Sequence, residues 1–109
     1  MIGILATGLE TGTWSLPTRA LDTIYQNTSG KKRRVIVGIN TSAAAAQRVK
    51  FVVGSASPPG TQIGRVGTAD ALSGSLLFTM SFEVPDTWFY RATIEAGTPT
   101  LDSWSELDE

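Results

Sequence analysis

The sequence contains no cysteine and no histidine. Catalysis by a Ser-His-Asp or a Cys-His arrangement is therefore excluded, as are metal sites built from thiolate or imidazole ligands. Disulfide bonds, which stabilise many small secreted domains, are excluded for the same reason. Carboxylates, hydroxyl groups, lysine, arginine and tyrosine remain for chemistry. We therefore predict a non-enzymatic protein without a catalytic, cofactor-binding or metal site.

An excess of one charge and long apolar runs are also lacking. Nine basic and ten acidic side chains give a formal net charge of −1, so the chain lacks the basic balance of a dedicated nucleic-acid binder. No apolar run approaches the ~20 residues that span a bilayer, and the first residues lack the pattern of a secretory signal. We expect synthesis in the cytoplasm, with no specific nucleic-acid partner and no membrane partner.

Alternation of apolar and polar residues with a period of two is the main pattern in the sequence. It is strongest in four segments: Arg34–Thr41, Arg48–Gly54, Ser75–Glu83 and Trp88–Glu95. Weaker strands are predicted at Ile2–Ala6, Thr23–Gln26, Gln62–Val66 and Leu101–Glu106. About seven to eight short strands separated by turn residues predict an all-β fold, either an antiparallel β-sandwich or a jelly roll.

A chain of 109 residues is one domain by size. Little periodicity is present before residue 18, so we predict an N-terminal arm over residues 1–17 and a β-sandwich domain over residues 18–109. Within the sandwich we expect Trp88 and Tyr90 in the core, because large aromatic side chains contribute much of a small core. Two positions stay open: Trp14 and Trp104 could close the sandwich or stack on a sugar in an exposed groove.

The opposite faces of the four strongest strands are polar except for one bulky apolar residue each: Ile36, Val52, Leu77 and Phe89. Single exposed apolar residues are common on protein surfaces. Alternatively, some of these residues meet in a patch that another subunit covers. We favour association between subunits, because the stability estimated for so small a core is close to zero.

Charged residues gather in two places. The only basic cluster consists of Lys31, Lys32, Arg33 and Arg34. It could contact an acidic partner, although a solvated hairpin end is the commoner role of such a cluster. The acidic C-terminal residues are Asp102, Glu106, Asp108 and Glu109. They lack the spacing of a calcium loop, so we expect a solubilising terminus or a charge partner for a neighbour's basic cluster.

Three segments together resemble parts of one known family. Thr18–Lys31 contains Arg19, then a leucine, the Tyr-x-Asn pair Tyr25 and Asn27, and a Thr-Ser-Gly turn. Phe82–Arg91 contains a Val-Pro-x-x-Trp-x-Tyr corner formed by Pro85, Trp88 and Tyr90. Gly97–Leu107 contains a closing Leu-x-x-Trp-x-Glu-Leu pattern around Trp104. In this order and spacing, the segments resemble a small β-domain of tailed-bacteriophage virion proteins.

The resemblance implies a trimeric, largely β virion module that usually ends a longer tail-fibre or spike chain and contacts a host surface glycan. Its motif residues would then be structural. Asp86 and Thr87 depart from the family, which usually has a glycine-containing pair at this corner. A globule with a radius of gyration of about 13 Å cannot carry a receptor tip away from a particle by itself. This favours a protein that docks directly on the virion.

We therefore expect a homotrimeric capsid decoration or cement protein, whose partner is the major capsid protein or another virion protein. Its docking arm would use four apolar residues, Ile2, Ile4, Leu5 and Leu9. The alternative is a tail-fibre or spike tip module that binds a host receptor or glycan. Carboxylate-based glycan cleavage and a cytoplasmic binding domain are further alternatives, and cleavage would require two carboxylates about 5–9 Å apart.

Overall fold

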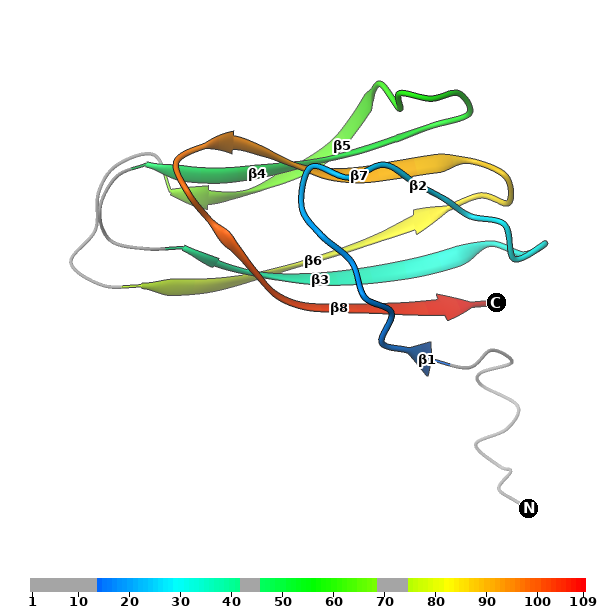
Figure 1. Ribbon diagram of the computed structural model, residues 1–109, viewed down its shortest axis with the longest axis horizontal. Coiled ribbons are helices and arrows are strands. Elements are labelled where there is room, and N and C mark those ends of the chain that lie inside the picture. Colours follow the sequence, from blue (N-terminus) through cyan, green and yellow to red (C-terminus); the bar gives the residue numbers. More distant parts are fainter. Residues whose placement is uncertain (1–13, 42–45, 69–74) are drawn as a thin grey trace, which may run out of the picture.

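The computed structural model describes residues 14–41, 46–68 and 75–109, and within these residues the fold is all-β. Two four-stranded antiparallel sheets face each other (Figure 1). The first sheet has the order β1-β8-β3-β6, with β1 at Trp14–Ser15, β8 at Thr100–Asp108, β3 at Arg33–Thr41 and β6 at Leu76–Val84. The second has the order β2-β7-β4-β5, with β2 at Tyr25–Gln26, β7 at Phe89–Ala96, β4 at Gln47–Gly54 and β5 at Thr61–Thr68. The predicted β-sandwich class is confirmed.

The four strongest alternating segments correspond to β3, β4, β6 and β7, with boundaries that differ by a residue or two. The weaker predictions at Thr23–Gln26, Gln62–Val66 and Leu101–Glu106 correspond to β2, β5 and β8. The observed β8 is longer than predicted because it pairs with β3 along most of its length. The predicted strand at Ile2–Ala6 lies outside the described residues.

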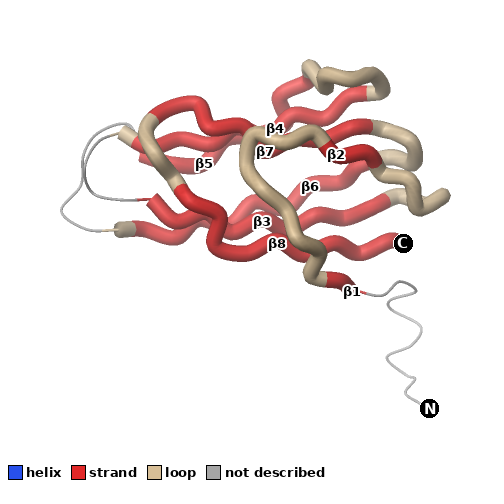
Figure 2. Tube along the Cα trace, in the orientation of Figure 1, coloured by secondary structure: helices blue, strands red, loops and turns tan. Residues whose placement is uncertain are grey.

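The sequence pattern did not predict β1, in which Trp14 pairs with Leu107 and Ser15 with Glu106 of β8. The last part of the predicted arm, residues 1–17, therefore belongs to the first sheet. After β1 the chain crosses to β2, so this segment joins one layer to the other (Figure 2). The crossing brings Arg19 and Tyr25 close to the strands of both sheets.

The core follows from the alternation. Val35, Val37 and Ile39 on β3 are fully buried, and they face the second sheet. The buried residues of the second sheet include Val49 and Phe51 of β4. Each sheet buries one face and leaves the other to solvent, which is the reason that a period of two is visible in the sequence.

One expected core residue lies elsewhere. Trp88 is 36% exposed, so its predicted core position is wrong, whereas Tyr90 is fully buried, as expected. Trp104, whose position the sequence left open, is 5% exposed and belongs to the core. The corner before β7 explains the position of Trp88. Thr87 has a positive φ, and Trp88 N donates a hydrogen bond to Pro85 O at 3.1 Å, so Trp88 ends a turn instead of beginning the strand.

A close approach between the sheets occurs at Gly64 of β5. A Cβ atom at this position would overlap the Cε of Met80 on β6. The register between β4 and β5 shifts next to Gly64, between Phe51 and Val52. A larger residue at this position would therefore require the flexible end of the Met80 side chain to move aside.

Candidate functional site

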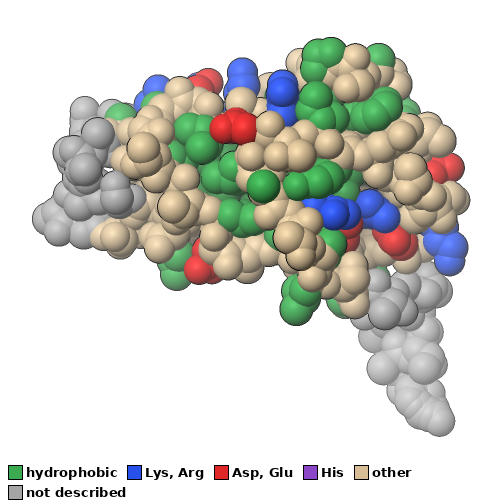
Figure 3. All heavy atoms as spheres, viewed as in Figure 1, with side chains coloured by type: hydrophobic (Ala, Val, Ile, Leu, Met, Phe, Trp, Pro, Cys, Tyr) green, Lys and Arg blue, Asp and Glu red, His purple; other side chains and the backbone are tan. Residues whose placement is uncertain are grey.

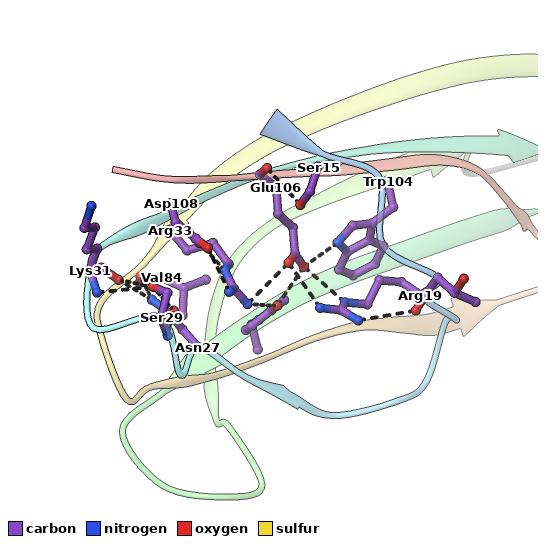
Figure 4. Close-up of polar contacts among 12 residues, drawn as sticks. Ser15, Arg19, Asn27, Ser29, Lys31, Arg33, Val84, Trp104, Glu106 and Asp108 are labelled. Atoms are coloured by element: carbon purple, nitrogen blue, oxygen red, sulfur yellow. Dashed lines mark hydrogen bonds and ion pairs between the residues drawn. The ribbon is translucent and has the colours of Figure 1, made fainter. Parts of the chain in front are cut away.

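A buried glutamate, Glu106 on β8, is the centre of a polar cluster between the two sheets (Figure 4). Its Oε2 atom accepts hydrogen bonds from Tyr90 Oη at 2.7 Å and from Trp104 Nε1 at 2.9 Å. Arg19 donates from Nε to Oε2 and from Nη2 to Oε1, each at 3.1 Å. Arg33 Nη1 lies 3.3 Å from Oε1. Five contacts therefore occupy the two carboxylate oxygens.

This arrangement stabilises the fold and leaves Glu106 unsuited to acid-base chemistry. The Glu106 side chain is 3% exposed, and both of its oxygens already bind donors. A buried carboxylate is tolerated when it is paired and fully hydrogen-bonded, as it is here. Removing one partner of such a pair destabilises a protein by about 3–5 kcal/mol, because the remaining charge stays buried without compensation.

Local sequence explains why these groups meet. Trp104 and Glu106 are two residues apart on β8 and so share its inward face. Arg33 is the first residue of β3 and pairs with Asp108 across the ladder, where Arg33 Nε donates to Asp108 Oδ1 at 2.6 Å. The crossing segment supplies Arg19, whose guanidinium lies 4.5 Å from the centre of the Tyr25 ring.

Burial and the carboxylate together shift the pKa values of this cluster. Burial disfavours the phenolate of Tyr90, and the hydrogen bond to Glu106 further favours the phenol, so the pKa of Tyr90 rises to about 12. Burial alone would lower the pKa of Arg33. Its hydrogen bonds to Asp108 and Tyr90 outweigh that effect and raise the pKa. Arg19 behaves in the same way through its bonds to Glu106, so both arginines stay charged near neutral pH.

A second polar cluster surrounds Asn27, which is fully buried. Its Nδ2 atom donates to Lys31 O at 2.7 Å, to Val84 O at 3.0 Å and to Pro85 O at 3.2 Å. Its Oδ1 atom accepts from Ser29 N at 3.1 Å and from Ser29 Oγ at 2.7 Å. One side chain therefore joins the turn between β2 and β3 to the corner between β6 and β7.

The two clusters bring together residues from the three segments noted in the sequence. The first segment supplies Arg19 and Tyr25, the second supplies Tyr90 and the third supplies Trp104. The Tyr25 ring centre lies 6.0 Å from that of Tyr90 and also 6.0 Å from that of Trp104. Asn27 and Pro85 meet at the neighbouring corner, and Trp88 joins them through its backbone carbonyl, which accepts from Asn27 N at 2.8 Å.

The basic cluster is largely neutralised within the chain. Arg33 is buried and pairs with Asp108 and Glu106. Lys32 and Arg34 each lie within ion-pair distance of both Glu83 and Glu109, and Lys31 is exposed. Of the acidic C-terminal residues, Glu106, Asp108 and Glu109 therefore bind arginines or a lysine of this chain itself. A contact between this cluster and an acidic partner stays a prediction. Among the residues that the structure describes, Lys31 is the member of the cluster that is not already paired with a carboxylate.

The four apolar residues of the predicted subunit patch lie on two opposite faces. Ile36 and Leu77 lie on the outward face of the first sheet, and Val52 and Phe89 lie on the outward face of the second. The two pairs therefore cannot form one continuous patch. Leu77 is 67% exposed, whereas Val52 is only 5% exposed and offers little surface to a partner. An interface at Ile36 and Leu77 stays a prediction.

The outward face of the second sheet is strongly basic, which the sequence did not reveal. Its charged residues are Arg48, Lys50, Arg65, Arg91 and Glu95. Lys and Arg side chains line the upper rim in Figure 3, over the strands of this sheet. Arg48 and Arg65 also line a shallow hollow of about 360 Å³ together with Val66, Gly67 and Thr68. The alternation of each strand predicts an outward side chain, but only the sheet order brings these cations together.

Several predicted features lie beyond these sites. The arm residues Ile2, Ile4, Leu5 and Leu9 fall outside the described residues. Within residues 14–41, 46–68 and 75–109, no group of three or more potential ligand side chains could hold a metal ion. The same part of the chain contains no helix with the length and apolarity to cross a membrane.

Comparisons with known protein families, curated proteins and solved structures find no match to this chain.

Proposed function

We propose that this chain is a non-enzymatic structural protein of a tailed-bacteriophage virion, where it docks on the capsid as a homotrimeric decoration or cement protein. The observation that carries the proposal is the meeting of the three family-like segments around Glu106 and Asn27. Side chains from all three segments take part in these buried contacts. Their roles here are structural, as the resemblance implies.

The chemistry of the surface supports an assembly role. The outward face of the first sheet combines exposed Leu77 and half-buried Ile36 with hydroxyl residues such as Thr79, Ser81 and Ser105. Centres of subunit interfaces are depleted of charge and enriched in apolar area. Ile36, Thr79, Ser81 and Ser105 form an uncharged part of this face between Arg34 and Glu83 at one end and the Asp102 carboxylate beside Gly38 at the other. We assign the contact between copies of the chain to this face.

Location in a purified particle tests the proposal directly. Antibody labelling or density assigned to this chain on the head exterior, with three copies at each position, is the expected result. Sedimentation of the pure protein should give the mass of a trimer at micromolar concentration. Absence from particles, or a monomer that coats no capsid, would refute the proposal.

A tail-fibre or spike tip module remains the second candidate, and one observation favours it. Trp88 is 36% exposed at the corner before β7, and half-buried Phe89 follows it. Exposed aromatic rings are suited to binding ligands that have one apolar face, including sugars. Labelling at the tail tip instead of the head would select this function, and a Trp88→Ala variant should then lose attachment to host cells.

A further inference from the structure

The outward face of the second sheet, which we call the basic face, concentrates positive charge. It consists of Arg48 and Lys50 on β4, Arg65 on β5, and Arg91, Thr93 and Glu95 on β7. Lys50 is at the centre, directly opposite Arg65 on one side and Thr93 on the other. Four cations and one carboxylate give this face a formal charge of +3, so the rest of the chain sums to −4 against the total of −1.

One end of the basic face already holds a carboxylate. Arg65 Nη1 lies 3.1 and 3.4 Å from the two oxygens of Glu95, and Arg48 Nε lies 3.3 Å from the nearer one. These two guanidinium groups are therefore oriented to bind a carboxylate, and Arg48 and Arg65 are only partly buried. A planar guanidinium fork is well suited to this ligand.

The other cations of the face are not neutralised. Neither Lys50 nor Arg91 has a carboxylate partner among the residues that the structure describes. Arg91 Nε and Thr93 Oγ1, two positions apart on β7, are buried and lack a hydrogen-bond partner within the same residues. Such unpaired donors cost free energy, which a side-chain rotation toward an incoming oxygen would recover.

The spacing of the cations fits an extended polypeptide. Successive residues of a strand rise by about 3.3 Å, so outward neighbours such as Arg48 and Lys50 are about 6.6 Å apart along β4. Alternate side chains of an extended peptide have the same spacing. We propose that the basic face binds an acidic, extended polypeptide segment of a partner protein, with alternate carboxylates over Arg48 and Lys50 and with Arg65 and Arg91 at the sides.

Other polyanions fit the face less well. Single-stranded nucleic acid is bound by aromatic rings that stack on bases between the phosphate contacts. The outward positions of β4 and β5 carry no aromatic residue, and Phe89 lies half-buried at the far end of β7. The face therefore offers charge and hydrogen-bond donors without a stacking surface, which favours carboxylate side chains on a peptide backbone.

Binding to the purified full chain tests this inference, which goes beyond the proposed function because it needs no particle. The probe is a fluorescently labelled peptide of alternating glutamate and serine, followed by anisotropy at low ionic strength. Lys50→Glu should weaken binding about tenfold, since it replaces attraction by repulsion at the centre of the face. Lys31→Glu makes the same charge change on the exposed turn before β3 and should weaken binding by less than about twofold.

A second variant and two other polymers make the result decisive. Arg91→Gln removes a charge without reversing it and should also weaken peptide binding, while circular dichroism confirms that each variant is folded. Equal losses in Lys50→Glu and Lys31→Glu, or no binding by the unmodified chain, would overturn the proposal. Tighter binding of oligothymidine or heparin than of the peptide, abolished by Lys50→Glu, would instead identify a nucleic-acid or glycan site and also overturn it.

Discussion

Arg19 and Glu106 lie 87 positions apart in the sequence and form a two-point ion pair, in which Nε and Nη2 of the arginine each lie 3.1 Å from a carboxylate oxygen. The pair joins the segment that crosses between the sheets to the last strand of the first sheet. Because Tyr90 of the second sheet binds the same carboxylate, one side chain connects both layers and the crossing segment. Loss of the Glu106 carboxylate would therefore remove contacts to the second sheet and to the crossing segment together.

Replacing Glu106 by glutamine should be strongly destabilising. The amide keeps the shape of the side chain, but it removes the negative charge that Arg19 and Arg33 share and replaces one acceptor by a donor. We expect urea unfolding to show a loss of about 3–5 kcal/mol. Glu83→Gln is the control, because Glu83 also has two ion pairs but is 45% exposed, and its loss should be below about 1 kcal/mol. Similar losses in the two variants would contradict the central role of Glu106.

Tyr90 should make stability depend on pH in the alkaline range. Its pKa is about 12 in the folded protein and about 10 in the unfolded chain, because burial and the bond to Glu106 are lost on unfolding. Between these values the folded state binds more protons, so the free energy of unfolding falls as pH rises from 10 to 12. Below pH 10 the contribution is fully present, and two pKa units correspond to roughly 2.7 kcal/mol.

Urea unfolding at several pH values, compared between the unmodified chain and Tyr90→Phe, checks this prediction. Because the two proteins differ only in the hydroxyl group of residue 90, the difference between their free energies of unfolding isolates the phenol. The difference between the free energies of unfolding of the two proteins should shrink steadily above pH 10. Parallel curves for the two proteins would show that the Tyr90 phenol is not protected in the folded state.

The strands could be predicted from the sequence because each sheet buries one face, which makes Val35, Val37 and Ile39 alternate with polar residues. The exposed position of Trp88 could not be predicted from the sequence, since it depends on a turn with a positive φ at Thr87. The pattern also treated Glu106 as part of an acidic tail. A charged residue two positions after an inward-facing tryptophan was the available signal that this glutamate is buried.

The basic face shows a different limit. Alternation indicates that Arg48, Lys50 and Arg91 point outward, but it does not say that β7, β4 and β5 are neighbours. The consecutive cluster at residues 31–34 is more conspicuous in the sequence, yet carboxylates from β6, β8 and the last residue, Glu109, neutralise most of it. A cluster of charges in the sequence therefore does not predict the electrostatic potential at the folded surface until the strand order is known.

Gly64→Ala should destabilise the sandwich because its new methyl group would overlap Met80 Cε. Because Met80 Cε is the end of a flexible side chain that can shift, we expect a loss near the lower end of the range of about 1–3 kcal/mol that is typical of overpacking. A Met80→Ala change in the same chain should remove the overlap, so the double variant should lose less than the sum of the two single losses. Thermal unfolding of the four proteins in this cycle gives the coupling. Strict additivity would show that the two residues do not compete for space.

Asn27→Asp should cost more stability than its small change in shape suggests. The carboxylate keeps the acceptor for Ser29, but it loses the Nδ2 donor that binds Lys31 O and Val84 O, and places a charge against these carbonyls. We expect a loss of at least about 2 kcal/mol in urea unfolding, since buried acceptors are left unpaired. Gln26→Glu changes the same groups at an exposed neighbour that makes one such bond, and should cost below about 1 kcal/mol.

Leu77→Glu should separate the proposed trimer into monomers while leaving the fold intact. Leu77 is 67% exposed in the single chain, so the folded monomer tolerates a charge there, but a subunit contact would bury the carboxylate without a partner. Sedimentation velocity, with both proteins at the same micromolar concentration, should therefore show a trimer for the unmodified chain and a monomer for the variant. Ile63→Glu is the control, because Ile63 is 40% exposed and lies on β5 of the second sheet, away from the proposed contact. A trimer that survives Leu77→Glu would place the subunit contact on another surface.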